Sequence, residues 1–335
     1  MKRDESIDTL RGIGSFCVMM EHTGVDGIHR LIYSPVMLPI FFFTSGYLLR
    51  PEMKVKDFIN KRILKLLIPW IIISYVQAYT NISDIRRMLK DANAIKEIGI
   101  DCTINILKGT AVWFVPALMV STIMAYAIMR LCKDQKLVIT VSFIVSVFAY
   151  FVLRKIEILN IWNINCALIN QIFIIVGYYV RHYLDNKPLD VCTMRKLAWA
   201  TPLFYIAEIA VSIKIFSYRG FNVKMNDIQN IIMYFILCFS GVFAVFALTK
   251  KWSHIPLITF MGSHSLLYFA FGSHGYIFGR KLLELLPFDI SGSAYALIIC
   301  IIACIAWIIP ALIIDRVCPI LNGGWSWDYY AKRNK

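Results

Sequence analysis

Long apolar segments recur along the whole chain of 335 residues, and each is about as long as a membrane-crossing helix. A helix needs about 20 mainly apolar residues to cross the hydrocarbon core of a bilayer. Only helices and closed barrels satisfy the backbone there, and the alternating pattern of barrel strands is absent. We therefore predict an all-α, polytopic membrane helical bundle of about ten spans, at residues 7–23, 33–50, 66–80, 111–131, 136–153, 165–181, 197–216, 228–248, 256–279 and 294–314.

Two of these spans are unusual. The third span is short at its polar end, and the ninth contains the polar run "GSHS", which predicts a bent or broken helix. No long polar block separates the spans, so residues 1–335 are expected to form a single membrane domain with a tail at about 315–335. A secretory signal peptide is not expected, because the first apolar run carries Arg11 and lacks a small-residue cleavage site.

Composition agrees with a membrane protein. Hydrophobic residues make up 59% of the chain and charged residues 17%, with a mean hydropathy of +0.64. Soluble domains carry about 25% charged residues. This composition therefore argues against a soluble globular enzyme.

The basic residues predict the orientation, because cytoplasmic loops carry an excess of Lys and Arg. With a cytoplasmic N-terminus, 22 of the 35 Lys and Arg residues fall in cytoplasmic segments and 12 in external ones. An even number of spans then places both termini in the cytoplasm. The net charge of +14 reflects this topology and contact with lipid headgroups, and no basic face with interleaved aromatic residues suggests nucleic acid as a partner.

The nine cysteines contain no C-x-x-C pair, and only Cys102 falls clearly in an external loop. Neither a disulfide framework nor a zinc site is indicated, and no metal is expected. We expect these cysteines to pack as small apolar side chains between helices.

Polar side chains form a stripe along the first span. Asp8, Arg11, Ser15 and His22 fall on one face of a helix with apolar flanks. Arg11 and His22 would stand about 16 Å apart along the axis. Ionisable groups that face lipid are costly, so the stripe should face the bundle interior or a wet cavity. Spacing alone leaves a second interpretation open, in which Arg11 is a positive-inside anchor and His22 an interfacial residue.

Three segments, taken in order, resemble the acyltransferase-3 family of integral membrane O-acyltransferases: "RDESIDTLRGIGSFCVMMEH", "MLPIFFFTSGYLLRP" and "KRILKLLIPW". In that family an arginine and a histidine separated by ten residues open the first helix. A phenylalanine-rich second helix and an R-x-x-R motif before the third follow. "AVWFVPAL" and "FMGSHSLLYFAFGSH" are similar to later family segments, so the resemblance runs from about residue 3 to residue 275.

The chain departs from the family pattern at three places. Arg62 and Lys65 stand at the two basic positions of the R-x-x-R motif. The second position therefore keeps its positive charge but lacks a guanidinium group, which can bind two oxygens at once. Many relatives carry a histidine where this chain has Met37. In the late Ser-Leu helix, relatives often carry a histidine seven residues after the serine. This chain has Gly272 at that position, and its nearest histidine, His274, follows two residues later.

The resemblance implies a multi-pass enzyme of the bacterial cytoplasmic membrane. Such enzymes move an acyl group, usually acetyl, from cytoplasmic acyl-coenzyme A to a hydroxyl of an extracytoplasmic or lipid-linked carbohydrate. His22 is the expected catalytic residue, because histidine titrates in the range useful to a general base. It would either deprotonate the acceptor hydroxyl or carry the acyl group itself.

The expected donor carries phosphates and needs cations on the cytoplasmic side. Arg62 and Lys65 supply them from one helical face, and Arg11 would meet the phosphates or the pantetheine arm. Acyl-coenzyme A, most simply acetyl-coenzyme A, is then a co-substrate, and no bound cofactor is expected. Positive-inside anchoring by Arg62 and Lys65 remains an alternative.

Further polar residues are candidates to line the site: Asp8, Ser15, Trp113, Glu208, Ser265 and His274. Glu208 could instead pair with a neighbouring helix, and Trp113 could be an interfacial anchor. Ser263 and His264 are adjacent, but such a pair makes no hydrolase triad without suitable geometry.

The main alternative is a transporter or flippase of anionic or lipid-linked sugars, which would also use intramembrane Arg, His and Glu and a broken helix. A membrane sensor or scaffold is a third possibility, weakened because no soluble output domain is evident. The ordered motifs favour the transferase.

Overall fold

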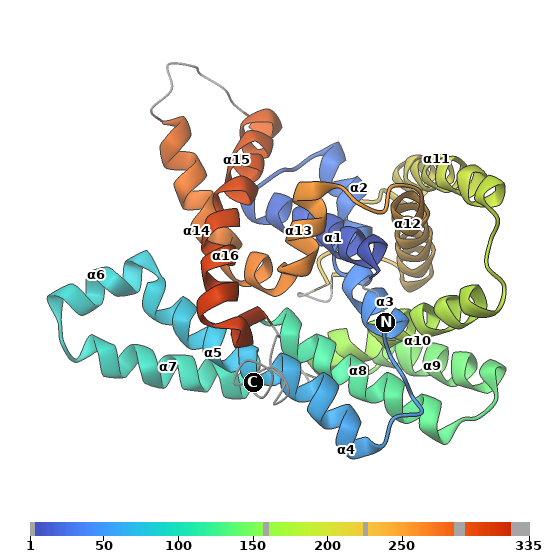
Figure 1. Cartoon of the computed structure of the whole chain (residues 1–335), viewed down its shortest axis with the longest axis horizontal. Helices are drawn as coiled ribbons and strands as arrows, with labels where there is room; N and C mark the ends of the chain where they lie inside the picture. Colours follow the sequence, from blue (N-terminus) through green and yellow to red (C-terminus); the bar gives the residue numbers. More distant parts are fainter. Residues whose placement is uncertain (1–3, 157–160, 224–226, 285–291, 323–335) are drawn as a thin grey trace, which may run out of the picture.

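The computed structural model describes residues 4–156, 161–223, 227–284 and 292–322 (Figure 1). The described part is built from helices, with one isolated β-bridge between Asn222 and Asp227, so the all-α prediction is confirmed. The α-helices are α1 (Glu5–Thr23), α2 (Ile28–Met37), α3 (Pro39–Tyr47), α4 (Val55–Phe58), α5 (Leu64–Thr80), α6 (Ile82–Lys90), α7 (Ala94–Lys108), α8 (Phe114–Leu131), α9 (Gln135–Phe151), α10 (Ile164–Asn186), α11 (Val191–Phe216), α12 (Ile231–Lys251), α13 (Pro256–Ser263), α14 (Ser265–Leu283), α15 (Gly292–Ala306) and α16 (Ile308–Val317).

Each of the ten predicted spans contains at least one helix. In the part of the chain that the structure describes, six helical segments are long and apolar enough to cross a membrane: Val55–Thr80, Phe114–Leu131, Ile161–Asn186, Val191–Phe216, Ile231–Lys251 and Gly292–Val317. The first span, α1, carries the polar stripe and is not among these six. A multi-pass helical membrane protein is therefore supported, while the count of ten spans and the orientation of the termini stay predictions.

Three predicted spans are broken helices. The ninth breaks at His264 between α13 and α14, as its polar run predicts. The second breaks at Leu38, directly before Pro39, and the tenth breaks at Trp307, shortly before Pro310. Proline lacks the backbone donor and its ring clashes with the preceding turn, so a helix ends or kinks there.

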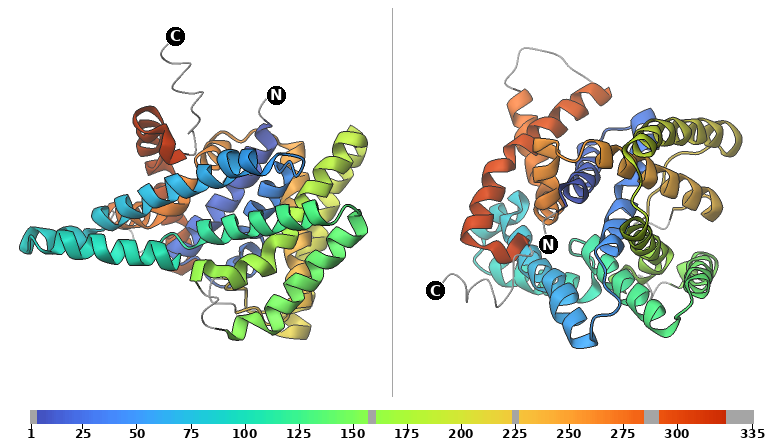
Figure 2. Two further views of the ribbon diagram at one scale, coloured as in Figure 1. Left: turned by 90° about the horizontal axis from the view of Figure 1, so that it is seen from below. Right: turned by 45° about the vertical axis from the view of Figure 1, so that its right-hand side comes forward.

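The segment between the third and fourth spans, predicted only as an external loop, forms a helical hairpin. Asn81 begins α6 by accepting a hydrogen bond from the backbone of Ser83, and Gly109, with φ of 72°, ends α7. These are ordinary helix-capping residues. The hairpin α6–α7 extends away from the rest of the bundle on one side (Figure 2).

The polar helix α1 lies in the middle of the molecule and contacts α2, α3, α12, α13, α14 and α15. Its closest neighbour is α13, because two glycines let the backbones approach. A β-carbon on Gly12 would overlap the carbonyl of Ile258, and one on Gly262 would overlap that of Asp8. Small residues at such crossings are typical of membrane helix packing.

We expect Gly12→Val or Gly262→Val to separate α1 from α13 and to lower stability by more than about 1 kcal/mol, the usual cost of overpacking. Thermal unfolding in detergent measures the effect. Ala200→Val places the same valine side chain at an exposed position on α11 and serves as the control. Equal melting temperatures for all three variants would show that the crossing is not tight.

The first turn of α1 is capped by Asp4. Its carboxylate accepts hydrogen bonds from the Ser6 backbone (3.1 Å), the Ser6 hydroxyl (2.6 Å) and Lys250 Nζ (2.9 Å). Partial burial raises the pKa of Asp4, but these hydrogen bonds and the charge of Lys250 outweigh burial, so the pKa lies below its ordinary value. The interaction ties the start of α1 to the end of α12.

A carboxylate with a lowered folded-state pKa stabilises the protein above its unfolded pKa of about 3.9 and loses that contribution as pH falls through the folded value. We therefore expect Asp4→Asn to lower the melting temperature at pH 6 and to differ little from wild type near pH 3. Asp26→Asn, an exposed acid in the loop after α1, is the control. A pH-independent difference for Asp4→Asn would contradict the assignment.

The buried helix α3 carries the "FFFTSGY" run and positions polar groups for the site. Phe41 and Phe42 both pack edge-on against Phe114 of α8, with ring centroids 5.5 and 5.3 Å apart. Such edge-to-face contacts are favourable and fix ring geometry. They hold α3 against α8, so that Ser45 reaches Thr122 with an oxygen–oxygen distance of 3.4 Å.

Candidate active site

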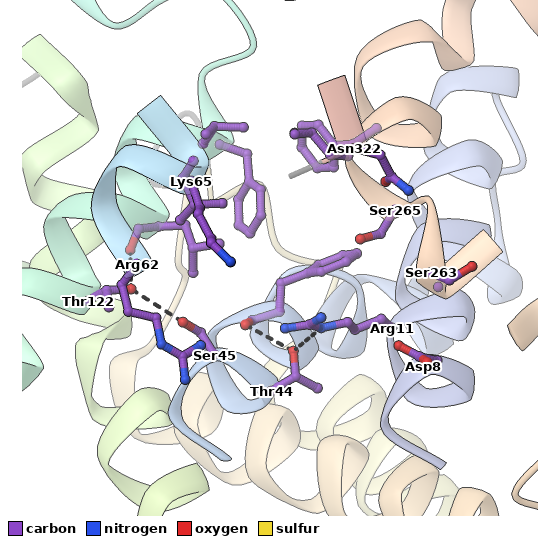
Figure 3. A pocket seen from close by; sticks show the side chains of 18 of the residues that line it. Asp8, Arg11, Thr44, Ser45, Arg62, Lys65, Thr122, Ser263, Ser265 and Asn322 are labelled. Atoms are coloured by element: carbon purple, nitrogen blue, oxygen red, sulfur yellow. Dashed lines mark hydrogen bonds between the residues drawn. The ribbon is translucent and has the colours of Figure 1, made fainter. Parts of the chain in front are cut away.

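A cavity of about 250 Å³ lies where α1, α3, α5, α8 and the break between α13 and α14 converge, and Figure 3 shows it from close by. The π-helical turn η1 (Ile59–Ile63) and the 3₁₀ turn η4 (Pro319–Asn322) complete its wall. Its polar lining is Asp8, Arg11, Thr44, Ser45, Lys61, Arg62, Lys65, Thr122, Ser263, Ser265 and Asn322. We call this space the basic cavity.

Arg11 reaches the basic cavity from the first helix. Its Nε donates a hydrogen bond to Thr44 Oγ1 (3.3 Å), and the Thr44 hydroxyl donates to the carbonyl of Phe41 (3.2 Å). Thr44 is fully buried, so its position is fixed by packing. This contact holds the Arg11 guanidinium toward the cavity (Figure 3).

The facing wall carries the basic residues before the third span. Arg62 donates a hydrogen bond to the carbonyl of Leu48, which holds its side chain across the end of α3. Lys65 lies one turn on and points into the cavity (Figure 3). Lys61 also lines the cavity but is 64% exposed, and its ion pair with Asp57 (3.7 Å) contributes little at such a surface.

The lining of the basic cavity carries an excess of positive charge. Among the described residues, four cationic side chains line it, against the single carboxylate of Asp8, which is buried. Guanidinium and ammonium groups that converge in this way bind phosphate and carboxylate through charge-assisted hydrogen bonds. The arrangement therefore suits an anionic ligand with several acceptor oxygens.

His22 lies at the other end of α1 and is not among the residues that line the basic cavity. Its imidazole is exposed and lies beside α14: a β-carbon on Gly272 would be 3.7 Å from His22 Cδ2. Arg11 and His22 are thus about 16 Å apart along one helix, as the spacing predicts.

The structure also separates Gly272 from His274. Gly272 faces Met19 and His22 of α1, whereas His274 Nε2 lies 3.2 Å from the carbonyl of Thr80 on α5. Two residues turn a helix by about 200°, so the two positions face different neighbours. His274 therefore does not occupy the place that residue 272 has beside His22.

The remaining candidate residues divide into two groups. Asp8 and Ser265 line the basic cavity, whereas Ser15, Trp113 and Glu208 do not. Ser15 is fully buried on the arginine face of α1, and its hydroxyl makes no hydrogen bond within the described part of the chain. Trp113 packs edge-on to Phe114, with ring centroids 6.1 Å apart, and Glu208 lies on α11, which packs against α12.

Sequence reasoning did not single out several polar residues of the basic cavity: Thr44, Ser45, Lys61, Thr122 and Asn322. The first two lie inside the phenylalanine-rich motif, where their polarity among apolar neighbours was an available signal. Lys61 directly precedes Arg62 in the basic run. Thr122 and Asn322 enter through tertiary packing and carry no signal in the sequence.

The adjacent Ser263 and His264 are arranged around the helix break. Ser263 Oγ donates to the carbonyl of Phe260 (2.8 Å), and His264 Nδ1 lies 3.0 Å from the same oxygen and 2.9 Å from Ser263 Oγ. His264 Nε2 is 3.7 Å from Asp315, too far for a hydrogen bond. Both side chains thus terminate α13, and the geometry is that of a cap, not of a nucleophile with its base.

Comparison with known proteins bears on the first quarter of the chain. Residues 4–83 match the model of a protein family described as an acyltransferase domain. No curated protein matches the chain, and no solved structure matches it. The resemblance found in the sequence is thereby confirmed over this segment: residues 4–83, which contain Arg11, His22, Arg62 and Lys65, match the acyltransferase-3 family model.

Proposed function

We propose that this protein is a membrane O-acyltransferase that takes an acyl group, most simply acetyl, from cytoplasmic acyl-coenzyme A and transfers it to a hydroxyl of an extracytoplasmic or lipid-linked carbohydrate. The observation that carries the proposal is the placement of Arg11, Arg62 and Lys65 around one cavity at one end of α1. His22 lies at the other end of the same helix. The family match at residues 4–83 supports the acyl-transfer chemistry.

The charge of the basic cavity suits the phosphates of the donor. Coenzyme A carries a pyrophosphate and a 3′-phosphate, and converging cations bind phosphate oxygens. The Arg62 guanidinium can bind two phosphate oxygens at once, whereas the Lys65 ammonium is a compact charge, so the two side chains would bind different oxygens. In the proposed orientation the cavity opens to the cytoplasm, where the donor is made.

The pantetheine arm would run along α1. The arm must carry the thioester about 16 Å from the cations to His22. Between them, Ser15 lies on the arginine face with a buried hydroxyl that has no hydrogen-bond partner among the described residues. An amide of the arm would satisfy this group, which otherwise bears a desolvation cost.

His22 would act on the acceptor at the far end. As a general base, its imidazole takes the proton of the acceptor hydroxyl while the oxygen attacks the thioester carbonyl, the carbon–sulfur bond breaks, and coenzyme A leaves as the thiolate. In the alternative route the imidazole itself attacks the thioester and then passes the acyl group to the hydroxyl. Both routes need His22 within reach of the thioester.

A transporter of anionic or lipid-linked sugars is the second candidate. Three of the ten predicted spans are broken helices, and transporters commonly bind substrate at such breaks. The cations of the basic cavity would then hold the substrate during transport. This candidate requires no acyl donor, which separates it from the transferase.

Vesicle sidedness tests the proposed function. Labelled acetyl-coenzyme A does not cross membranes, so inside-out vesicles offer it to the cytoplasmic face and right-side-out vesicles to the external face. With cell-derived glycan as acceptor on both faces of the membrane, we expect transfer of label only in inside-out vesicles, whose lumen then holds the glycan. Label transfer in right-side-out vesicles, or none in either, would contradict the proposal.

A further inference from the structure

A second cavity, of about 360 Å³, lies where the hairpin α6–α7 meets the C-terminal half of α5 and the middle of α14. Its lining is predominantly polar: Ser74, Gln77, Asn81, Asp84, Arg87, Asp101, Cys102, Asn105 and His274, with Ala78, Ile98 and Ala111. We call it the hairpin cavity. It shares α5 and α14 with the basic cavity, which lies toward the N-terminal ends of both helices.

Hydrogen bonds and ion pairs fix the helices that line the hairpin cavity. Gln77 Nε2 donates to the carbonyl of Ala270 (2.8 Å), which ties α5 to α14. Arg87 of α6 contacts Asp84 (3.4 Å) and Glu97 of α7 (3.1 Å), which ties the two arms of the hairpin together. The polar lining is therefore positioned by four helices, because α5 also contacts both α6 and α7.

His274 leaves an acceptor for a ligand. Its Nε2 lies 3.2 Å from the carbonyl of Thr80, and a carbonyl can only accept, so the tautomer that pairs this carbonyl carries its proton on Nε2. Nδ1 is then an acceptor, and it is buried without a hydrogen-bond partner in the described part of the chain. Buried polar atoms are rarely left unpaired, and a hydroxyl is the matching donor.

The charge of the hairpin cavity is opposite to that of the basic cavity. Its only guanidinium within the described residues, that of Arg87, is shared by Asp84 and Glu97. The carboxylate of Asp101, the second of the lining, is exposed to solvent and makes no hydrogen bond or ion pair to another described residue. Such a lining accepts hydrogen bonds from hydroxyls and attracts amines, and it repels carboxylates and phosphates.

We propose that the hairpin cavity binds the acyl acceptor, and that the acceptor unit seated there is a hydroxyl-bearing sugar that is neutral or carries an amine, and is not acidic. The inference rests on the proposed function and adds the place and the charge of the acceptor. His22 faces Gly272, two residues before His274, so the cavity lies at the same end of the bundle as the proposed catalytic residue.

Binding of three size-matched probes tests the inference without any acyl donor present. Purified full-length protein in nanodiscs is titrated calorimetrically with maltotriose, the glucosamine trimer and trigalacturonate. We expect the glucosamine trimer to bind most tightly, maltotriose within about tenfold of it, and trigalacturonate at least about tenfold more weakly than the glucosamine trimer.

Substitutions of Asp101 locate the site. We expect Asp101→Asn to weaken the glucosamine trimer about tenfold and maltotriose less than twofold. Asp101→Lys should reverse the order of the glucosamine trimer and trigalacturonate. Asp91→Asn removes the same charge outside the cavity, at the exposed end of α6, and should change nothing.

Three results would overturn the inference: tightest binding of trigalacturonate to wild type, no measurable binding of any trimer, or equal effects of the Asp101 and Asp91 substitutions. Labelled acetyl-coenzyme A binding to the same preparations separates this outcome from failure of the proposed function. If the donor binds and the trimers do not, the acceptor site is wrong and the transferase stands. If the trimers bind and the donor does not, the transferase fails.

Discussion

Arg62→Ala is expected to weaken binding of acetyl-coenzyme A by about 10- to 100-fold, which corresponds to loss of one charge-assisted contact of about 1.5–3 kcal/mol. Arg62 lines the basic cavity, and its hydrogen bond to Leu48 fixes the side chain there before the donor arrives. Little conformational entropy remains to be lost on binding, so the contact should be fully effective. The dissociation constant for labelled acetyl-coenzyme A, measured on purified protein, gives the effect.

Two variants sharpen this prediction. Arg130→Ala removes an exposed arginine at the end of α8, outside the basic cavity, and should leave the dissociation constant within twofold. Arg62→Lys keeps the charge but loses the fork, so its affinity should fall between wild type and Arg62→Ala. Equal affinities for Arg62→Ala and Arg130→Ala would mean that the cations only anchor the helix at the membrane.

His22→Ala is expected to reduce acyl transfer by about 10²- to 10⁴-fold, the usual contribution of a positioned acid–base group. Donor affinity should change less than twofold, because His22 lies at the opposite end of α1 from the basic cavity. Initial rates of transfer and donor binding, measured on the same preparation, separate these two effects.

His29→Ala is the matched control for His22→Ala. His29 is an exposed histidine at the start of α2, and its loss should affect neither rate nor binding. A parallel loss of donor affinity in His22→Ala would indicate that His22 belongs to the donor site. Equal rates in His22→Ala and His29→Ala would remove His22 from the chemistry.

The length of the apolar runs predicted the helical class, because a helix of that length crosses the bilayer and satisfies its backbone polar groups within itself. It did not predict the breaks at Leu38 and Trp307, since apolar residues continue across both and only a nearby proline marks them. The hairpin α6–α7 was also missed. Charged residues interrupt its apolar positions, and the capping residues Asn81 and Gly109 were its available signal.

The candidate site was predictable only in part. Arg11 and the pair Arg62 and Lys65 stand about 50 residues apart in sequence, and chemistry alone suggested one phosphate-bearing ligand for all three. The structure brings them to one cavity, while their role in donor binding stays a prediction. Thr122 and Asn322 join the same cavity through tertiary packing, which no local pattern encodes.

The most direct measurement of the central claim follows labelled acetyl-coenzyme A added to inside-out vesicles that contain wild-type protein or His22→Ala at equal protein levels. Cell-derived glycan is enclosed in the vesicle lumen, which is the extracytoplasmic side. Release of coenzyme A and entry of label into protein, lipid and glycan are recorded together. Acyl transfer predicts label in lipid or glycan for wild type and its loss in His22→Ala. Absence of turnover in wild type with acceptor present would contradict the transferase and favour the transporter.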